Sequence, residues 1–198
     1  MKTTFKSVIV FLVLATCSCK KEQVNEPNAL PSNNASSAVK QDSLNSEDTN
    51  YLVTSAEGSR LEVVLGGMAQ THAKDINVKE FGLKMVQDHS LEHKQVVNMA
   101  GSKNVDVPNH PSKDQQEEID ELSKYYGDEF DKQYISYEVW DHKQDIKDAA
   151  GEIQDGKDTD VKNMAKMWTP ILISHLEYAE WVAKKVDAPV YHDDKDGH

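Results

Sequence analysis

Three histidines interrupt apolar stripes that have helical spacing. Within residues 161–186, apolar side chains recur at steps of three and four and draw one face of a helix, and His175 fills a gap in that face. His89 and His142 hold the corresponding place in two further stripes. A histidine on an apolar face is either a packed core residue or a ligand, and imidazole nitrogens bind several first-row transition metals. The pattern therefore leaves two readings open, a metal site and a polar network in the core.

The elements that must position these histidines are all helical. Long helices are predicted over residues 46–73, 78–103, 128–154 and 159–186, with Asn77 as the cap of the second and Asp158 or Thr159 as the cap of the fourth. A short charged helix is predicted over residues 113–126, and Pro170 is expected to kink the last helix. No alternation of period two persists. The predicted fold is an all-α four-helix bundle with a short extra helix between helices two and three.

Each of the three histidines lies near the middle of its helix. A midpoint keeps its level in a bundle whichever way the helix runs, so the three rings should lie at one level of the core. Further candidates lie near that level: Glu57 and Glu62 on the first helix, and His93 one turn beyond His89. The predicted metal ligands are His89, His142, His175, Glu62, Glu57 and His93. Such a set would suit Zn, Cu, Fe or Mn, and the sequence does not select among them.

The alternative is a structural network without metal. In that reading the three histidines hydrogen-bond to one another, to Tyr134 or to Glu138. Asp88 and Asp141 each adjoin a histidine but are rotated from it by about 100° on the helix, which allows a supporting role or a surface one.

The amino-acid composition argues against several classes of protein. The formal net charge of −12 argues against nucleic acid, which requires clustered basic residues. Both cysteines, Cys17 and Cys19, lie in the first residues, so a mature domain would hold a metal through His, Asp and Glu. No nucleophile-elbow, P-loop or zincin motif is present, so we assign no catalytic residue and favour a protein that is not an enzyme.

The N-terminus is expected to be a targeting segment. Lys2 and Lys6 precede an apolar run over residues 8–15 that is too short to span a bilayer, and Cys19 follows a small residue as in a lipobox. Cys17, or an ordinary cleaved signal peptide, is the alternative. We predict a lipoprotein signal peptide over residues 1–18, a disordered tether over 19–45, the bundle over 46–187 and a polar tail over 188–198. The partner would then be a membrane, through the lipid anchor, with the protein facing periplasm or cell surface; the choice of membrane and any protein partners stay open.

Part of the chain resembles a known family. Residues 51–182 are similar to bacterial exported proteins grouped as domain of unknown function 4142, which form ferritin-like four-helix bundles. The resemblance rests on residues 61–66, 85–89, 141–142 and 172–175. It implies the fold and an envelope location, and it favours Glu62 over Glu57, but it supplies no reaction.

The histidines depart from the diiron pattern of ferritin-like proteins. Those proteins use Glu-x-x-His on two helices, whereas Val86, Val139 and Leu172 stand three residues before the histidines here. Ferroxidase or oxygenase chemistry is therefore not expected. The sequence predicts a lipid-anchored envelope protein with transition-metal binding in the bundle core, or alternatively a structural or adaptor lipoprotein whose core histidines only pack.

Overall fold

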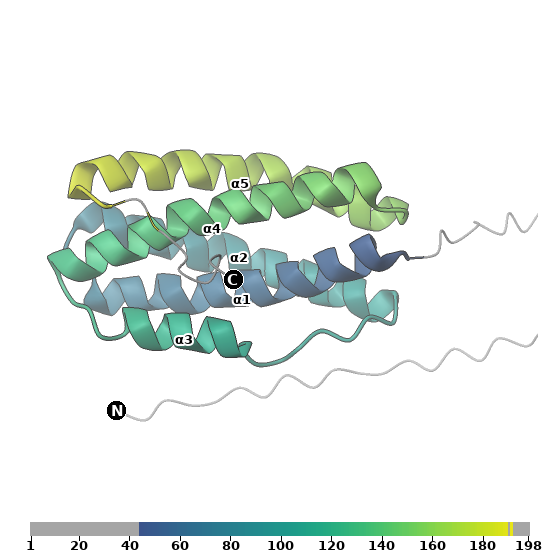
Figure 1. The fold of residues 1–198 in the computed structure, drawn as a ribbon, viewed down its shortest axis with the longest axis horizontal. Coiled ribbons are helices and arrows are strands. Elements are labelled where there is room, and N and C mark those ends of the chain that lie inside the picture. Colours follow the sequence, from purple (N-terminus) through teal and green to yellow (C-terminus); the bar gives the residue numbers. More distant parts are fainter. Residues whose placement is uncertain (1–43, 190, 192–198) are drawn as a thin grey trace, which may run out of the picture. The chain divides into compact units, whose positions relative to one another are not determined.

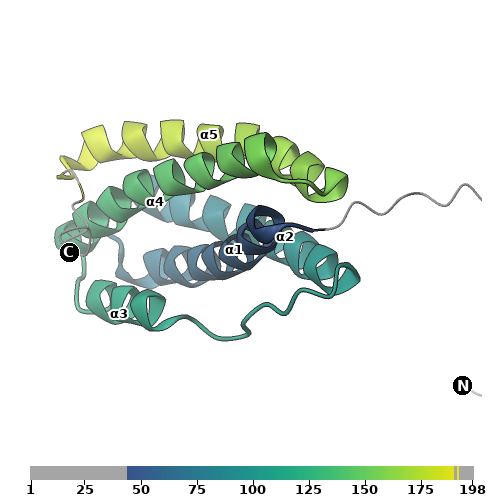
Figure 2. The same cartoon turned by 45° about the vertical axis from the view of Figure 1, so that its right-hand side comes forward.

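The structure is a computed structural model that describes residues 44–189 and residue 191. The predicted signal peptide lies outside this part, as do most of the predicted tether and of the polar tail. The helices of the described residues are α1 (Ser46–His72), α2 (Ile76–Ser102), α3 (Lys113–Leu122), α4 (Asp128–Asp155) and α5 (Thr159–Val186). The four long helices lie side by side and α3 packs outside them against α1 and α4 (Figures 1 and 2). The predicted all-α, ferritin-like four-helix bundle is confirmed.

Side-chain caps set the helix starts. Asn45 and Asp48 form a reciprocal capping box at α1, and Ser112 and Gln115 form one at α3. The cap of α2 is Asp75 rather than the predicted Asn77, because the Asp75 carboxylate accepts the backbone N–H of Asn77 at 2.7 Å.

One further expectation about the helices needs correction. The short helix α3 ends at Leu122 and does not reach residue 126. Helix α5 is a single helix that contains Pro170, and the kink expected there stays a prediction.

Helix α1 packs mainly on α2, and α4 mainly on α5. Gly66 marks the close approach of the first pair: a Cβ atom at this position would lie 2.5 Å from the carbonyl oxygen of Gly82. Gly67, its neighbour, would meet nothing within 4 Å. Of the two adjacent glycines, only Gly66 is therefore required by the packing.

The apolar core is divided into two clusters with a polar layer between them. One cluster contains Leu65, Phe81, Phe130, Tyr134 and Val182, and the other contains Leu52, Val96, Ala149, Val161 and Trp168. The buried polar residues that form this layer are Ser59 and Glu62 on α1, His89 and Glu92 on α2, Glu138 and His142 on α4, and His175 on α5. Among the described residues, no helix is both long and apolar enough to cross a membrane.

Candidate metal centre

The three mid-helix histidines converge in the polar layer. The ring centroids of His89 and His142 are 5.7 Å apart, those of His89 and His175 are 5.2 Å apart, and those of His142 and His175 are 5.4 Å apart. The side chains are 1%, 0% and 0% exposed in the order His89, His142, His175. One ring nitrogen of each lies within 4.8 Å of the others. Three helices thus bring three imidazoles to one buried point.

One nitrogen of each ring is held by an acceptor. Nδ1 of His89 lies 2.6 Å from Oε2 of Glu92, and Nε2 of His175 lies 2.8 Å from Oδ2 of Asp88. Nδ1 of His142 donates to the backbone carbonyl oxygen of Glu138 at 2.9 Å. A carbonyl oxygen only accepts, and so does an ionised carboxylate, so a neutral ring must carry its proton on the nitrogen that faces the acceptor. These contacts therefore fix the tautomer of each ring.

The other nitrogen of each ring has no hydrogen-bond partner although it is buried. These atoms are Nε2 of His89, Nε2 of His142 and Nδ1 of His175. By the tautomers just described, each presents a lone pair rather than a proton. In the described part of the chain, no hydrogen bond joins two of the rings or links a ring to Tyr134. The inward side of the cluster is thus a set of unpaired acceptors, which is the arrangement a metal ion requires.

The environment keeps the rings of His142 and His175 neutral. Burial lowers the pKa of His142 well below its usual value, and the neighbouring rings of His89 and His175 lower it further. Burial also lowers the pKa of His175 to about 4, against the opposing hydrogen bond to Asp88. Metal ligation needs the neutral imidazole, so both rings are in the required form at physiological pH.

Two buried carboxyl groups adjoin the histidines. Glu62 of α1 and Glu138 of α4 are both 0% exposed, and their carboxyl groups interact with each other, with Asp141 and with Tyr134. One oxygen from each lies within 4.8 Å of a ring nitrogen of His142 and of the other. Burial and the charge of Glu138 raise the pKa of Glu62 well above its usual value, and burial raises the pKa of Glu138 to about 8. The pair therefore favours either a shared proton or a bound cation.

The sequence of this bundle matches a protein family over most of its length. The family model for the domain of unknown function DUF4142 matches residues 33–182. The chain belongs to this family. Membership in DUF4142 confirms the resemblance drawn from the sequence. The curated proteins contain no match.

Solved structures show the same fold as this DUF4142 chain. A DUF305 fragment from Deinococcus radiodurans has a TM-score of 0.64 at 10% identity, covering 72% of this chain and 99% of its own. A DUF305 protein from Streptomyces coelicolor, described as secreted, has a TM-score of 0.64 at 12% identity, with coverage of 75% and 98%. A protein from Bacillus halodurans described as a spore coat protein has a TM-score of 0.59 at 14% identity, with coverage of 77% and 98%. At such identities the likeness concerns the fold alone.

The remaining predicted site residues fall into different surroundings. Glu57 is half-buried and belongs to neither group of converging ligand atoms. His93 is also outside them, and its Nδ1 donates to the carbonyl oxygen of Ala56 at 2.9 Å, which ties α2 to α1. Asp88 is a direct hydrogen-bond partner of His175. Asp141 accepts a hydrogen bond from the Tyr137 hydroxyl at 3.1 Å, and its Oδ2 is buried without a partner.

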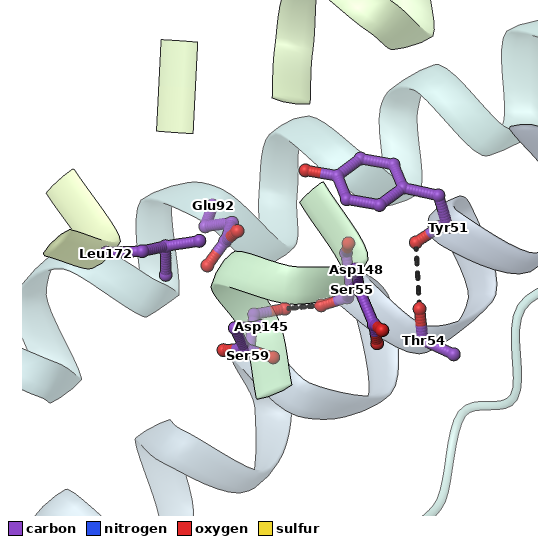
Figure 3. Close-up of a pocket in the computed structure, with 8 residues that line it drawn as sticks. All are labelled: Tyr51, Thr54, Ser55, Ser59, Glu92, Asp145, Asp148 and Leu172. Carbon is purple, nitrogen blue, oxygen red and sulfur yellow. Dashed lines mark hydrogen bonds between the residues drawn. The ribbon is translucent and has the colours of Figure 1, made fainter. Parts of the chain in front are cut away.

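Glu92 is a site residue that the sequence interpretation missed. It stands three residues after His89, a spacing that places two side chains on one helix face, and this signal was available in the sequence. Glu92 also lines a cavity of about 10 Å³, the size of one water molecule, together with Asp145, Asp148 and Ser59. Figure 3 shows the three carboxylates gathered around this cavity. Acidic side chains therefore lie next to Glu92, the residue whose carboxylate contacts Nδ1 of His89.

Proposed function

We propose that this protein binds a transition-metal ion in the bundle core through Nε2 of His89, Nε2 of His142 and Nδ1 of His175. The observation that carries the proposal is that the two nitrogens of each ring have different surroundings. One nitrogen is fixed by a carboxylate or a carbonyl oxygen, and the other is buried and unpaired, in three rings that bring one nitrogen each within 4.8 Å of the others. Metal-binding histidines use such outer hydrogen bonds to fix the tautomer and raise the basicity of the ligating nitrogen.

The donor set indicates the class of metal. Three neutral imidazoles favour Zn²⁺ or Cu²⁺ over Mn²⁺ or Mg²⁺, which prefer oxygen ligands. Tetrahedral ligands at ~2.1 Å from zinc are about 3.4 Å from one another. The ring nitrogens lie within 4.8 Å of one another, so modest side-chain rotations would complete the geometry. Three protein ligands leave a fourth position for water or another small ligand.

The surrounding carboxylates would balance the charge of the ion. Glu92 and Asp88 lie on the outer nitrogens of His89 and His175, where each can partly neutralise a divalent cation. The hydrogen bond from Lys84 to Asp88 keeps that carboxylate ionised, since it and the bond from His175 outweigh burial and lower the pKa of Asp88. This arrangement supports binding and storage or buffering of a metal, and nothing in it requires a reaction.

The place of action in this proposal is the cell envelope. Cys19 after a short apolar run supports a lipid anchor, and α1 begins at Ser46, which leaves the intervening residues as a tether between anchor and bundle. The protein would then hold its metal site near a membrane surface without inserting the bundle into it.

The decisive experiment is metal titration of protein purified without a histidine tag. Apo protein should bind one equivalent of Zn²⁺ or Cu²⁺ by calorimetry, and His89→Ala, His142→Ala and His175→Ala should each lose that binding. His110→Ala is the matched control, because His110 is exposed in the loop before α3. A ligand at 100 times its dissociation constant stabilises by about 2.7 kcal/mol, so metal should also raise Tm in the wild type. Wild-type protein that neither binds these ions nor changes its melting would overturn the proposal.

A structural or adaptor role is the second candidate. One surface feature favours it, a groove of about 680 Å³ between α4 and α5 that includes Val139, Trp140, Ala183 and Pro189. Under this alternative the histidines serve packing alone, and the metal titration gives no binding.

A further inference from the structure

Beside the three-histidine cluster lies a separate set of buried oxygen ligands. We propose that Glu62 of α1 and Glu138 of α4 form a second cation site, one that takes a divalent ion preferring oxygen ligands, such as Mn²⁺. The proposal rests on the proposed function, because His142 belongs to both groups of converging ligand atoms and would stand between two ions. The core would thus hold two metals of different chemistry next to each other.

Burial supplies the first argument. Both glutamates are 0% exposed, and their carboxyl groups interact with each other, with Asp141 and with the hydroxyl of Tyr134. Among residues 44–189 and 191, no lysine or arginine forms an ion pair with any of these three carboxyl groups. Burial raises the pKa of both glutamates, so without a cation they hold protons, and a divalent ion would displace those protons and neutralise two carboxylates at once.

The geometry supplies the second argument. One oxygen of Glu62, one oxygen of Glu138 and one ring nitrogen of His142 all lie within 4.8 Å of one another. Nδ1 of His142 already donates to the backbone carbonyl of Glu138, and it is 3.5 Å from Oε2 of the same residue. The Nδ1 proton is therefore taken up by that carbonyl, and this nitrogen is not a metal ligand. The ligands of the second ion are accordingly the carboxyl oxygens, and the hydroxyl of Tyr134, which interacts with Glu138, is a further neighbour.

Access to the two sites differs as well. Asp141, beside the glutamates, also lines a surface pocket of about 240 Å³ under α3, where Asp114 and Glu118 are further acidic members. The three-histidine cluster instead adjoins the small cavity at Glu92 and Asp145. Acidic residues thus lie next to each site, on different sides of the core, and their negative charge would attract cations.

The test uses two probe ions and isosteric variants of the full chain. Apo protein is loaded with Zn²⁺ and Mn²⁺ together, and bound metals are counted by mass spectrometry and Mn²⁺ by electron paramagnetic resonance. The wild type should bind one Zn²⁺ and one Mn²⁺. Glu62→Gln and Glu138→Gln should each lose Mn²⁺ and keep Zn²⁺, and His89→Ala should lose Zn²⁺. Glu152→Gln is the matched control, since Glu152 is another glutamate of α4 that is 0% exposed with both oxygens unpaired, but it is outside both ligand groups.

The outcomes separate the two proposals. Wild type with Zn²⁺ but no Mn²⁺ overturns the second site and leaves the three-histidine site standing. Loss of Zn²⁺ together with Mn²⁺ in the folded glutamine variants also overturns it, because the carboxylates would then belong to one shared site. Wild type without either ion overturns both proposals. If a variant does not fold, anomalous scattering from metal-soaked wild-type crystals decides, with two separate peaks expected and a single peak contradicting the second site.

Discussion

His89 and Glu92 stand one helical turn apart on α2, and Nδ1 of the first lies 2.6 Å from Oε2 of the second with both side chains buried. This contact holds the ring proton on Nδ1 and leaves Nε2 as the unpaired nitrogen. The tautomer that a metal needs is therefore set by a residue that need not touch the metal.

Replacing Glu92 by glutamine should weaken Zn²⁺ binding by about 10–100-fold without abolishing it, the range found when outer partners of metal-bound histidines are changed. The amide can turn its NH₂ group toward Nδ1 and so drive the proton to the ligating nitrogen. Calorimetric titration measures the effect. Glu80→Gln, at an exposed position of the same helix, is the control and should bind as the wild type does. Equal affinity in Glu92→Gln would show that the contact does not orient His89 for a metal.

Two adjacent glycines of α1 give opposite predictions. Gly66→Ala should destabilise the protein by roughly 1–3 kcal/mol, because the new methyl group would lie 2.5 Å from the carbonyl oxygen of Gly82. Gly67→Ala meets nothing within 4 Å and should stabilise by up to about 1 kcal/mol through helix propensity. Urea unfolding of both variants measures the difference, and equal effects would mean that α1 and α2 do not approach at Gly66.

Glu152 should make stability depend on pH. Burial and the charge of Asp48 raise the pKa of Glu152 from 4.5 to about 8, and Glu47 acts in the same direction while Lys162 opposes it. Between these values the folded state binds more protons than the unfolded state, so this residue's contribution to stability is present below pH about 4.5 and is lost as pH rises toward 8. Glu152→Gln should therefore lose less stability than the wild type between pH 5 and pH 8.

The measurement is urea unfolding at several values in that interval, with chelator present so that metal binding does not contribute. Asp155→Asn, an exposed neighbour on α4, is the control and should keep the wild-type slope. The same slope in Glu152→Gln and wild type would contradict a protonated Glu152 in the folded state.

The proposed lipid anchor predicts a defined N-terminus. Mass spectrometry of protein from a bacterial membrane fraction should find Cys19 as the first residue, carrying two or three acyl chains, since a single chain binds only reversibly. Cys19→Ser should release the protein from the membrane, while Cys17→Ser should leave it anchored. A mature chain that begins downstream of Cys19 without modification would reject the anchor.

The sequence by itself determined the helices and the inward faces of the histidines. The 3.6-residue period places His89, His142 and His175 on apolar stripes, and their mid-helix positions predict a common level, where the structure brings their rings within 5.7 Å. Helical periodicity, however, predicts the inward face of a helix only to within a fraction of a turn. Glu57 and Glu62 were therefore both candidates, and only the rotation of α1 against its neighbours buries Glu62 beside Glu138 and leaves Glu57 half-exposed.

Tertiary structure alone decided which nitrogen of each ring is held by an acceptor. That choice depends on side-chain rotamers, which are fixed by acceptors such as Asp88 of α2 for His175 of α5, and residues 87 positions apart carry no periodic signal of their contact. The same holds for the polar layer as a whole. Sequence spacing predicts that each long helix places polar residues on its buried face. Whether those residues form one set of ligands or separate hydrogen-bonded pairs depends on how the two apolar clusters pack on either side of them.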